Sequence, residues 1–298
     1  MSGGESTEVR PASSAAATGA GRGAGARPSR ERLPWRPWQI VRFSLGYLSH
    51  GLGDLFFILM TIPLAALLTV LPRYRYRLVR GIVSRYLVLM FQRVLPFLGV
   101  YRIDEVAGLD RAQEGAPVVF VANHRGRLDG PLLLSYLQRT GVVVKSRYAR
   151  HGTLAVLAWV FDFITIDSRS LDSLASMAAE VRRLLERGMN LLIFPEGSRS
   201  VSGRLLPFRN AAFRLALEQG RPVVPVIVHS TAPFMSKSLA SFFPREPLRY
   251  RIRFLPAQRP APGETAEDLA ARVHRLMARE LRDLDPGTAW PSWKGSQP

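Results

Sequence analysis

The chain contains no cysteine among its 298 residues. This absence excludes disulfides, thiolate zinc sites and a cysteine nucleophile. The sequence also lacks the G-x-S-x-G turn that presents the catalytic serine of α/β-hydrolases. Its His, Asp and Glu residues are not spaced as metal ligands usually are. We therefore expect no metal site and no resident cofactor.

Acidic residues are scarce as well: Asp and Glu number 23 against 41 Lys and Arg, a formal net charge of +18. None lies between Leu55 and Ile103, a segment that holds seven arginines. This imbalance indicates an anionic partner such as nucleic acid, a membrane surface or a phosphorylated substrate. The positive charge overlaps an apolar segment and does not alternate with stacking aromatic residues, so it favours a membrane. A basic nucleic-acid-binding protein is the alternative from another class.

The ends of the chain differ in composition from the middle. Residues 1–34 are rich in Ala, Gly and Ser, and they have too few bulky apolar side chains to offset the entropy of ordering. We predict a disordered tail over 1–34, membrane-binding helices over 35–100, a catalytic domain over 101–285 and a C-terminal tail over 286–298.

The acid-free segment begins with 17 uncharged residues, Leu55–Leu71, which is the lower limit for crossing a bilayer. Pro63 would kink a helix there. From Leu78, apolar residues recur at helical spacing on one face, namely Leu78, Ile82, Tyr86, Met90 and Val94. We favour a hairpin of two helices that dip into, or lie on, an anionic membrane. A buried core hairpin and a single spanning helix are the alternatives.

From residue 101 the pattern changes to alternating strands and helices. The predicted strands are short apolar runs, as expected for strands covered on both faces: Val118–Ala122, Val142–Lys145, Ile164–Asp167, Asn190–Phe194 and Val223–His229. Tyr250, Ile252 and Phe254 alternate with arginines and predict a further strand. The pattern indicates an α/β fold with a mixed, mostly parallel sheet flanked by helices.

The stretch ANHRGRLDGP at 122–131 follows the first of these strands. His124 and Asp129 lie about 140° apart on a regular helix, so they can meet only across a turn, which Gly126 permits. In the functional interpretation, Asp129 accepts a hydrogen bond from one ring nitrogen of His124 and leaves the other free as a base. In the alternative, Asp129 only caps a helix that has Pro131 in its first turn, and His124 is a loop residue.

A second stretch, LLIFPEGSRS at 191–200, runs from a buried strand directly into polar residues. The guanidinium of Arg199 suits a phosphate, and Gly197 lets the backbone approach a ligand closely. Arg209 could add positive potential nearby. An ordinary turn with a local ion pair is the alternative, and so is a serine hydrolase that uses Ser198 or Ser200 beside Glu196.

These stretches together resemble the PlsC-like glycerolipid acyltransferase family. The resemblance rests on Asn-His with four residues before Asp, on FPEGSRS about 70 residues later, and on PVVPVIV at 222–228. It covers roughly 118–230. This chain has Gly126 where the family often has Ser, and Ser168 where it usually has Arg, with Arg169 one place later.

The resemblance implies transfer of a fatty acyl group from acyl-CoA or acyl-carrier protein to the free hydroxyl of 1-acyl-sn-glycerol 3-phosphate. It implies His124 as the general base and Asp129 as its partner. Glu196, Gly197 and Ser198 would shape the acceptor site, and Arg199 would hold the acceptor phosphate, with Arg169 or Arg209. Another lysophospholipid, a lyso-ornithine lipid or a glycolipid is the alternative acceptor.

The same resemblance implies partners and a location. Membrane phospholipids, the acyl donor and the lyso-lipid acceptor are the expected partners, and no nucleic acid is expected. The enzyme would be associated with the cytoplasmic face of the cell membrane.

Overall fold

A computed structural model describes most of the chain, and every described residue belongs to the compact unit Trp35–Pro298. The described residues are 37–67, 72–113, 115, 117–146, 155, 158, 163–166, 171–200, 204–232, 234–235 and 248–285. The predicted tails at 1–34 and 286–298, and Arg169, lie outside them and stay predictions.

Seven strands form one sheet in the order β1-β7-β6-β2-β5-β3-β4. Their bounds are β1 (Arg102–Ala107), β2 (Val119–Ala122), β3 (Thr140–Lys145), β4 (Ile164–Ile166), β5 (Asn190–Ile193), β6 (Val223–Ser230) and β7 (Arg249–Phe254). Strands β6, β2, β5, β3 and β4 are parallel, and the pair β6–β7 is antiparallel. The sheet is therefore mixed and mostly parallel, as the apolar runs predicted.

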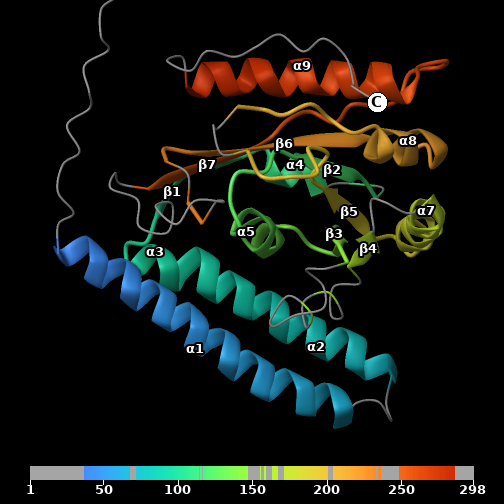
Figure 1. Ribbon diagram of the computed structural model, residues 1–298. Helices are drawn as coiled ribbons and strands as arrows, with labels where there is room; N and C mark the ends of the chain where they lie inside the picture. The colour runs from blue at the N-terminus through green and yellow to red at the C-terminus, as the bar shows by residue number, and fades with distance from the viewer. Residues whose placement is uncertain are drawn as a thin grey trace, which may run out of the picture. The chain divides into compact units, whose positions relative to one another are not determined.

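Helices cover both faces of the sheet (Figure 1). Their bounds are α1 (Pro37–Leu67), α2 (Pro72–Leu87), the π-helix η2 (Val88–Val94), α3 (Leu95–Phe97), α4 (Leu109–Gln113), α5 (Asp129–Tyr136), α7 (Leu171–Glu186), α8 (Ala211–Glu218) and α9 (Ala266–Leu284). Helices α7, α8 and α9 belong to one apolar cluster, whereas α1, α2, η2 and α5 belong to the other.

The alternating side chains of β2 show how the sheet separates the two apolar clusters. Val119 and Val121 join the cluster of α7, α8 and α9, whereas Phe120 and Ala122 join the cluster of α5 and the N-terminal helices. Successive side chains of a strand point to opposite faces, so a fully apolar strand is needed between two cores. All four of these residues are fully buried.

The N-terminal helices differ from the predicted pattern in one respect. Leu78 and Ile82 are 49% and 38% exposed, whereas Met90 is buried, so the five predicted residues do not share one buried face. The buried residues of α2 are instead Val83 and Leu87, and η2 begins at Val88, so regular helical spacing ends before Met90. In the described part of the chain, no helix combines the length and apolarity needed to cross a membrane.

Candidate active site

His124 and Asp129 meet at the carboxyl end of β2. His124 lies in the loop that follows the strand, and Asp129 is the first residue of α5. The ring nitrogen Nδ1 of His124 lies 2.8 Å from the carboxylate oxygen Oδ2 of Asp129. The Asp129 side chain is fully buried, whereas 23% of the His124 side chain is exposed. The pair is therefore anchored inside the protein and accessible from one side.

The loop between the two residues folds around the Asp129 carboxylate. The backbone N–H groups of Arg125 and Gly126 donate to the same Oδ2 atom, at 2.6 and 2.7 Å. Both donors precede the helix, so Asp129 does not act as a cap for α5. A side chain at position 126 would place its Cβ 2.3 Å from the backbone carbonyl oxygen of Phe234. Glycine at this position is required by that close approach.

These hydrogen bonds determine which ring nitrogen of His124 can act as a base. A carboxylate, when ionised, only accepts hydrogen bonds, so in that state the N–H at Nδ1 is the donor and Asp129 the acceptor. The neutral ring then has its lone pair on Nε2. The ring also packs against Phe194, with centroids 4.4 Å apart, which restricts its rotation.

Glu196 joins the two sequence motifs. Its Oε1 accepts the backbone N–H of His124 at 2.8 Å, and its Oε2 accepts the N–H of Leu206 at 3.0 Å. In return, the N–H of Ser200 donates to the carbonyl oxygen of His124 at 2.7 Å. Burial raises the pKa of Glu196 to about 8, although the two N–H donors oppose this shift. Both carboxylate oxygens are therefore occupied by the protein itself.

The arginines of the second motif have different surroundings. A guanidinium nitrogen of Arg199 donates to the carbonyl oxygen of Met235 at 3.0 Å. Arg209 is exposed and lies over Gly197, which has a φ of +63° and whose Cβ, if present, would be 2.8 Å from Nε of Arg209. The structure thus places Arg209 beside this loop. Gly197 has a backbone conformation that favours glycine, and the absence of a side chain at this position leaves room for Arg209.

The two serines of the loop have different surroundings. Ser198 is half-buried, and the Ser200 hydroxyl donates to the carbonyl oxygen of Arg204 at 2.5 Å. Among the described residues, no group of three His, Asp or Glu side chains is placed to hold a metal ion.

Asn123 is part of the first motif, but the sequence predicted no role for it. Its side-chain amide donates to the carbonyl oxygen of Val228 at 3.0 Å and accepts the N–H of the same residue at 2.7 Å. The neighbouring Arg125 is half-buried, and its guanidinium donates to the carbonyl oxygen of Ser230 at 2.8 Å. The sequence signal for these two residues is that a polar side chain stands on each side of His124, directly after an apolar strand. Both side chains tie the His124 loop to the end of β6.

A comparison with known proteins matches the region that holds these residues. Residues 104–229 match the family model described as Acyltransferase. Over these residues, which make up less than half of its length, the chain is similar to the acyltransferases. The acyltransferase match includes both sequence motifs and the whole of the loop from His124 to Asp129.

Several relatives of this chain have names that state an activity. The human 1-acyl-sn-glycerol-3-phosphate acyltransferase alpha is 30% identical over 60% of this chain and 64% of its own length. The protein named 1-acyl-sn-glycerol-3-phosphate acyltransferase in Haemophilus influenzae is 27% identical over 69% of this chain and 82% of its own length. The chain thus spans less than two thirds of the human relative.

A solved structure supports the fold of this chain. The crystal structure of the 1-acyl-sn-glycerophosphate (LPA) acyltransferase PlsC from Thermotoga maritima has a TM-score of 0.67. It is 17% identical in sequence and covers 84% of this chain and 98% of its own length.

Proposed function

We propose that the protein transfers a fatty acyl group from acyl-CoA or acyl-carrier protein to the free hydroxyl of 1-acyl-sn-glycerol 3-phosphate. The observation that carries this proposal is the contact of His124 with a buried carboxylate that two backbone N–H groups hold in place. The names of the human and Haemophilus relatives point to the same acceptor.

The chemistry needs one base and no covalent intermediate on the enzyme. Nε2 of His124 removes the proton of the acceptor hydroxyl while the oxygen attacks the thioester carbon. The tetrahedral intermediate then collapses, the carbon–sulfur bond breaks, and the thiolate takes the proton back from the imidazolium. Asp129 stabilises that imidazolium. General-base assistance of this kind accelerates a reaction by about 10²–10⁴-fold.

The acceptor phosphate is assigned to the basic side of the second motif. Arg199 and Arg209 both lie in or beside the Glu196–Ser200 loop, which is hydrogen-bonded to His124. Arginine suits this role because its planar fork matches phosphate oxygens. Gly197 and Ser198 would shape the acceptor site, whereas Glu196 acts mainly by fixing the His124 backbone. Arg169 remains a further candidate.

The N-terminal helices would hold the enzyme on the cytoplasmic face of the membrane. One side of α1 exposes a row of apolar side chains: Trp38, Val41, Leu45, Leu48, Leu52, Leu55 and Leu59, each at least half exposed. A helix with this surface is stabilised when the apolar row enters the boundary between lipid headgroups and acyl chains. Both the acceptor and the product are lipids, so catalysis benefits from this location.

The test is a panel of labelled acyl-CoA and acyl-carrier-protein donors with a set of lyso-lipid acceptors. Lysophosphatidic acid, which is 1-acyl-sn-glycerol 3-phosphate, should give the highest kcat/KM. A clear preference for a lyso-ornithine lipid, a glycolipid or another lysophospholipid would contradict the assigned acceptor but not the acyl transfer itself. Absence of transfer to every acceptor would contradict the proposed function.

Arg199→Ala sharpens the phosphate assignment. We expect a higher KM for lysophosphatidic acid, by roughly tenfold or more, and little change in KM for the acyl donor. Steady-state kinetics with each substrate varied in turn separates the two. A change confined to the donor would show that Arg199 does not hold the acceptor phosphate.

A further inference from the structure

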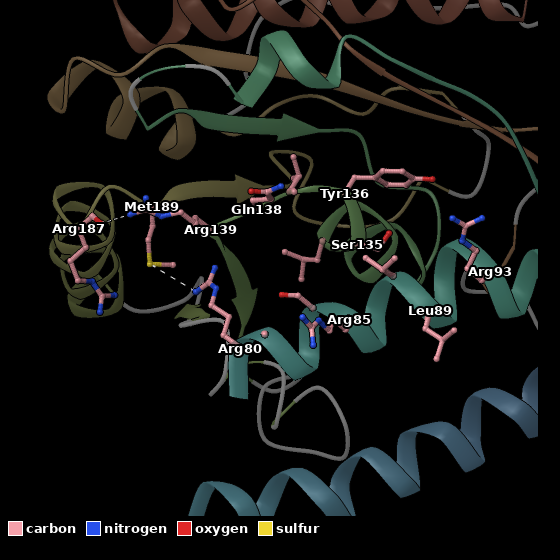
Figure 2. A pocket seen from close by; sticks show the side chains of 15 residues that line it. Arg80, Arg85, Leu89, Arg93, Ser135, Tyr136, Gln138, Arg139, Arg187 and Met189 are labelled. Atoms are coloured by element: carbon pink, nitrogen blue, oxygen red, sulfur yellow. Dashed lines mark hydrogen bonds between the residues drawn. The ribbon is translucent and has the colours of Figure 1, made fainter. Parts of the chain in front are cut away.

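A groove of about 990 Å³, shown in Figure 2, does not include His124 in its lining. One wall is formed by α2 and η2, and the other by the end of α5 and the residues that precede β3 and β5. In Figure 2, Arg80 reaches from α2 towards Met189 on the opposite wall. The groove is therefore a space between the N-terminal helices and the sheet domain.

The parallel sheet places this groove far from the reacting groups. His124 follows the carboxyl end of β2, whereas Arg139 and Met189 come directly before β3 and β5. Strands β2, β5 and β3 run parallel. Their amino ends lie at the opposite edge of the sheet from their carboxyl ends. The groove and His124 are therefore at opposite edges.

All the charged side chains that line the groove are positive. Five arginines line it, Arg80, Arg85, Arg93, Arg139 and Arg187, and none of its lining residues is Asp or Glu. Throughout the described ranges, neither Arg85 nor Arg93 has a carboxylate within ion-pair distance. Guanidinium groups gathered in this way repel one another unless an anion lies between them. The groove therefore favours a negatively charged ligand.

The apolar part of the lining adds a second requirement. Val88 and Leu89 of η2 lie beside the arginines and are 37% and 56% exposed, and Leu137 forms part of the other wall. Leu78 and Ile82 continue an exposed apolar surface along the same helices. A nucleic acid or a free phosphate would leave these side chains in water. An anion with hydrocarbon chains would cover them.

The backbone around the groove is irregular. The π-helix η2, a rare conformation that is frequent at functional sites, supplies Val88, Leu89 and Arg93 to the lining. Arg139 has a φ of +47°, which is uncommon for a residue with a side chain. Strain of this kind persists where the surrounding structure imposes it.

We propose that this groove binds one anionic phospholipid of the bilayer, at a site separate from the acceptor site. The phosphate lies among Arg85, Arg93 and Arg139, and the acyl chains run along Val88 and Leu89. The bound lipid joins α2 and η2 to the sheet domain and thereby orients the domain on an anionic membrane. This binding does not depend on acyl transfer.

The test compares two double variants that each remove two positive charges. Arg85→Gln with Arg93→Gln removes two of the five arginines that line the groove. Both side chains are exposed, so the fold should be retained. The matched control is Arg275→Gln with Arg279→Gln, two exposed arginines of α9 on the other side of the sheet. Vesicle flotation measures binding to phosphatidylcholine with and without phosphatidylmethanol, a diacyl phosphodiester that has no hydroxyl to acylate.

The groove variant should lose most of the gain in affinity that phosphatidylmethanol gives, about thirty-fold for two arginines near a membrane surface. The α9 variant should lose less than threefold. Equal losses in the two variants would show a general surface effect and overturn the proposal. No loss in the groove variant would overturn it as well.

Two further measurements identify the occupant. A phospholipid with a photoreactive acyl chain should label residues of η2 or the end of α5, and labelling restricted to α1 would contradict a discrete site. Saturating coenzyme A should not displace the lipid, and displacement would assign the groove to the acyl donor. The His124→Ala protein should retain the binding, so failure here is distinguishable from failure of the proposed function.

Discussion

The two edges of the sheet use polar side chains in opposite ways. At the carboxyl edge, Asn123, Asp129 and Glu196 are buried, and each makes at least two hydrogen bonds with backbone groups. At the amino edge, Arg85 and Arg93 are exposed and have no carboxylate partner among the described residues. One edge is fixed by the protein itself, whereas the other leaves two arginines without a carboxylate partner in the described part of the chain, and we propose that a lipid binds there.

This difference follows from what each edge has to do. Proton transfer requires the base to be held within hydrogen-bond distance of its target, so the geometry must exist before the substrate arrives. Binding to an anionic surface depends mainly on charge and apolar area, and tolerates flexible side chains. Variants at the two edges should therefore separate catalysis from lipid binding.

The largest effect is expected at Asp129. Asp129→Asn keeps an oxygen for the N–H groups of Arg125 and Gly126 but removes the charge that stabilises the imidazolium. We expect kcat/KM to fall by about 10²–10⁴-fold, with vesicle binding unchanged. The matched control is Asp110→Asn, an exposed acid in α4, which should keep full activity. A near-normal kcat/KM for the Asp129→Asn protein would show that the carboxylate charge has no role in acyl transfer.

The pH dependence of stability tests the buried carboxylate of Glu196. Its pKa is about 8 in the folded protein and near 4.5 when unfolded, so the folded state holds the extra proton between these values. Wild type should therefore lose stability relative to Glu196→Gln as the pH rises from about 4.5 to about 8, by on the order of a few kcal/mol. Urea unfolding at several pH values measures the difference. A difference that is constant with pH would mean that the folded-state pKa of Glu196 is not raised.

A smaller effect is expected at Gly126, whose substitution strains the His124 loop. Gly126→Ala forces a Cβ to within 2.3 Å of the Phe234 carbonyl oxygen unless the backbone shifts. We expect a loss of about 1–3 kcal/mol in the free energy of unfolding. Gly130→Ala is the control, because its Cβ would meet nothing within 4 Å and alanine favours the helix α5. Thermal unfolding of the two variants should shift in opposite directions.

The core strands could be predicted from sequence because each is a continuous apolar run between polar loops. Strand β1 could not, because Arg102, Asp104 and Glu105 make it polar. It is held by contacts with distant residues: Arg249 pairs with Asp104 at 2.6 Å, and Arg253 with Glu105 at 2.8 Å. Local patterns contain no information on such pairs, which are about 145 residues apart.

The candidate site could likewise be predicted only in part. Two polar motifs after buried strands were visible in the sequence, because a charged residue there is costly unless it is used. The hydrogen bond from His124 N–H to Glu196 was not, because it depends on how β2 and β5 pair. The π-helix was also hidden, since an apolar helical pattern does not reveal a change in residues per turn. Register and helix geometry are properties of the packed protein.

The most direct measurement is acyl transfer by purified His124→Ala protein that is matched to wild type in folding and in binding to anionic vesicles. Removing the imidazole removes the base, so transfer from acyl-CoA or acyl-carrier protein to lysophosphatidic acid should fall to the background rate while vesicle binding stays unchanged. Transfer at a near-normal rate by this variant would contradict the assignment of His124 as the base.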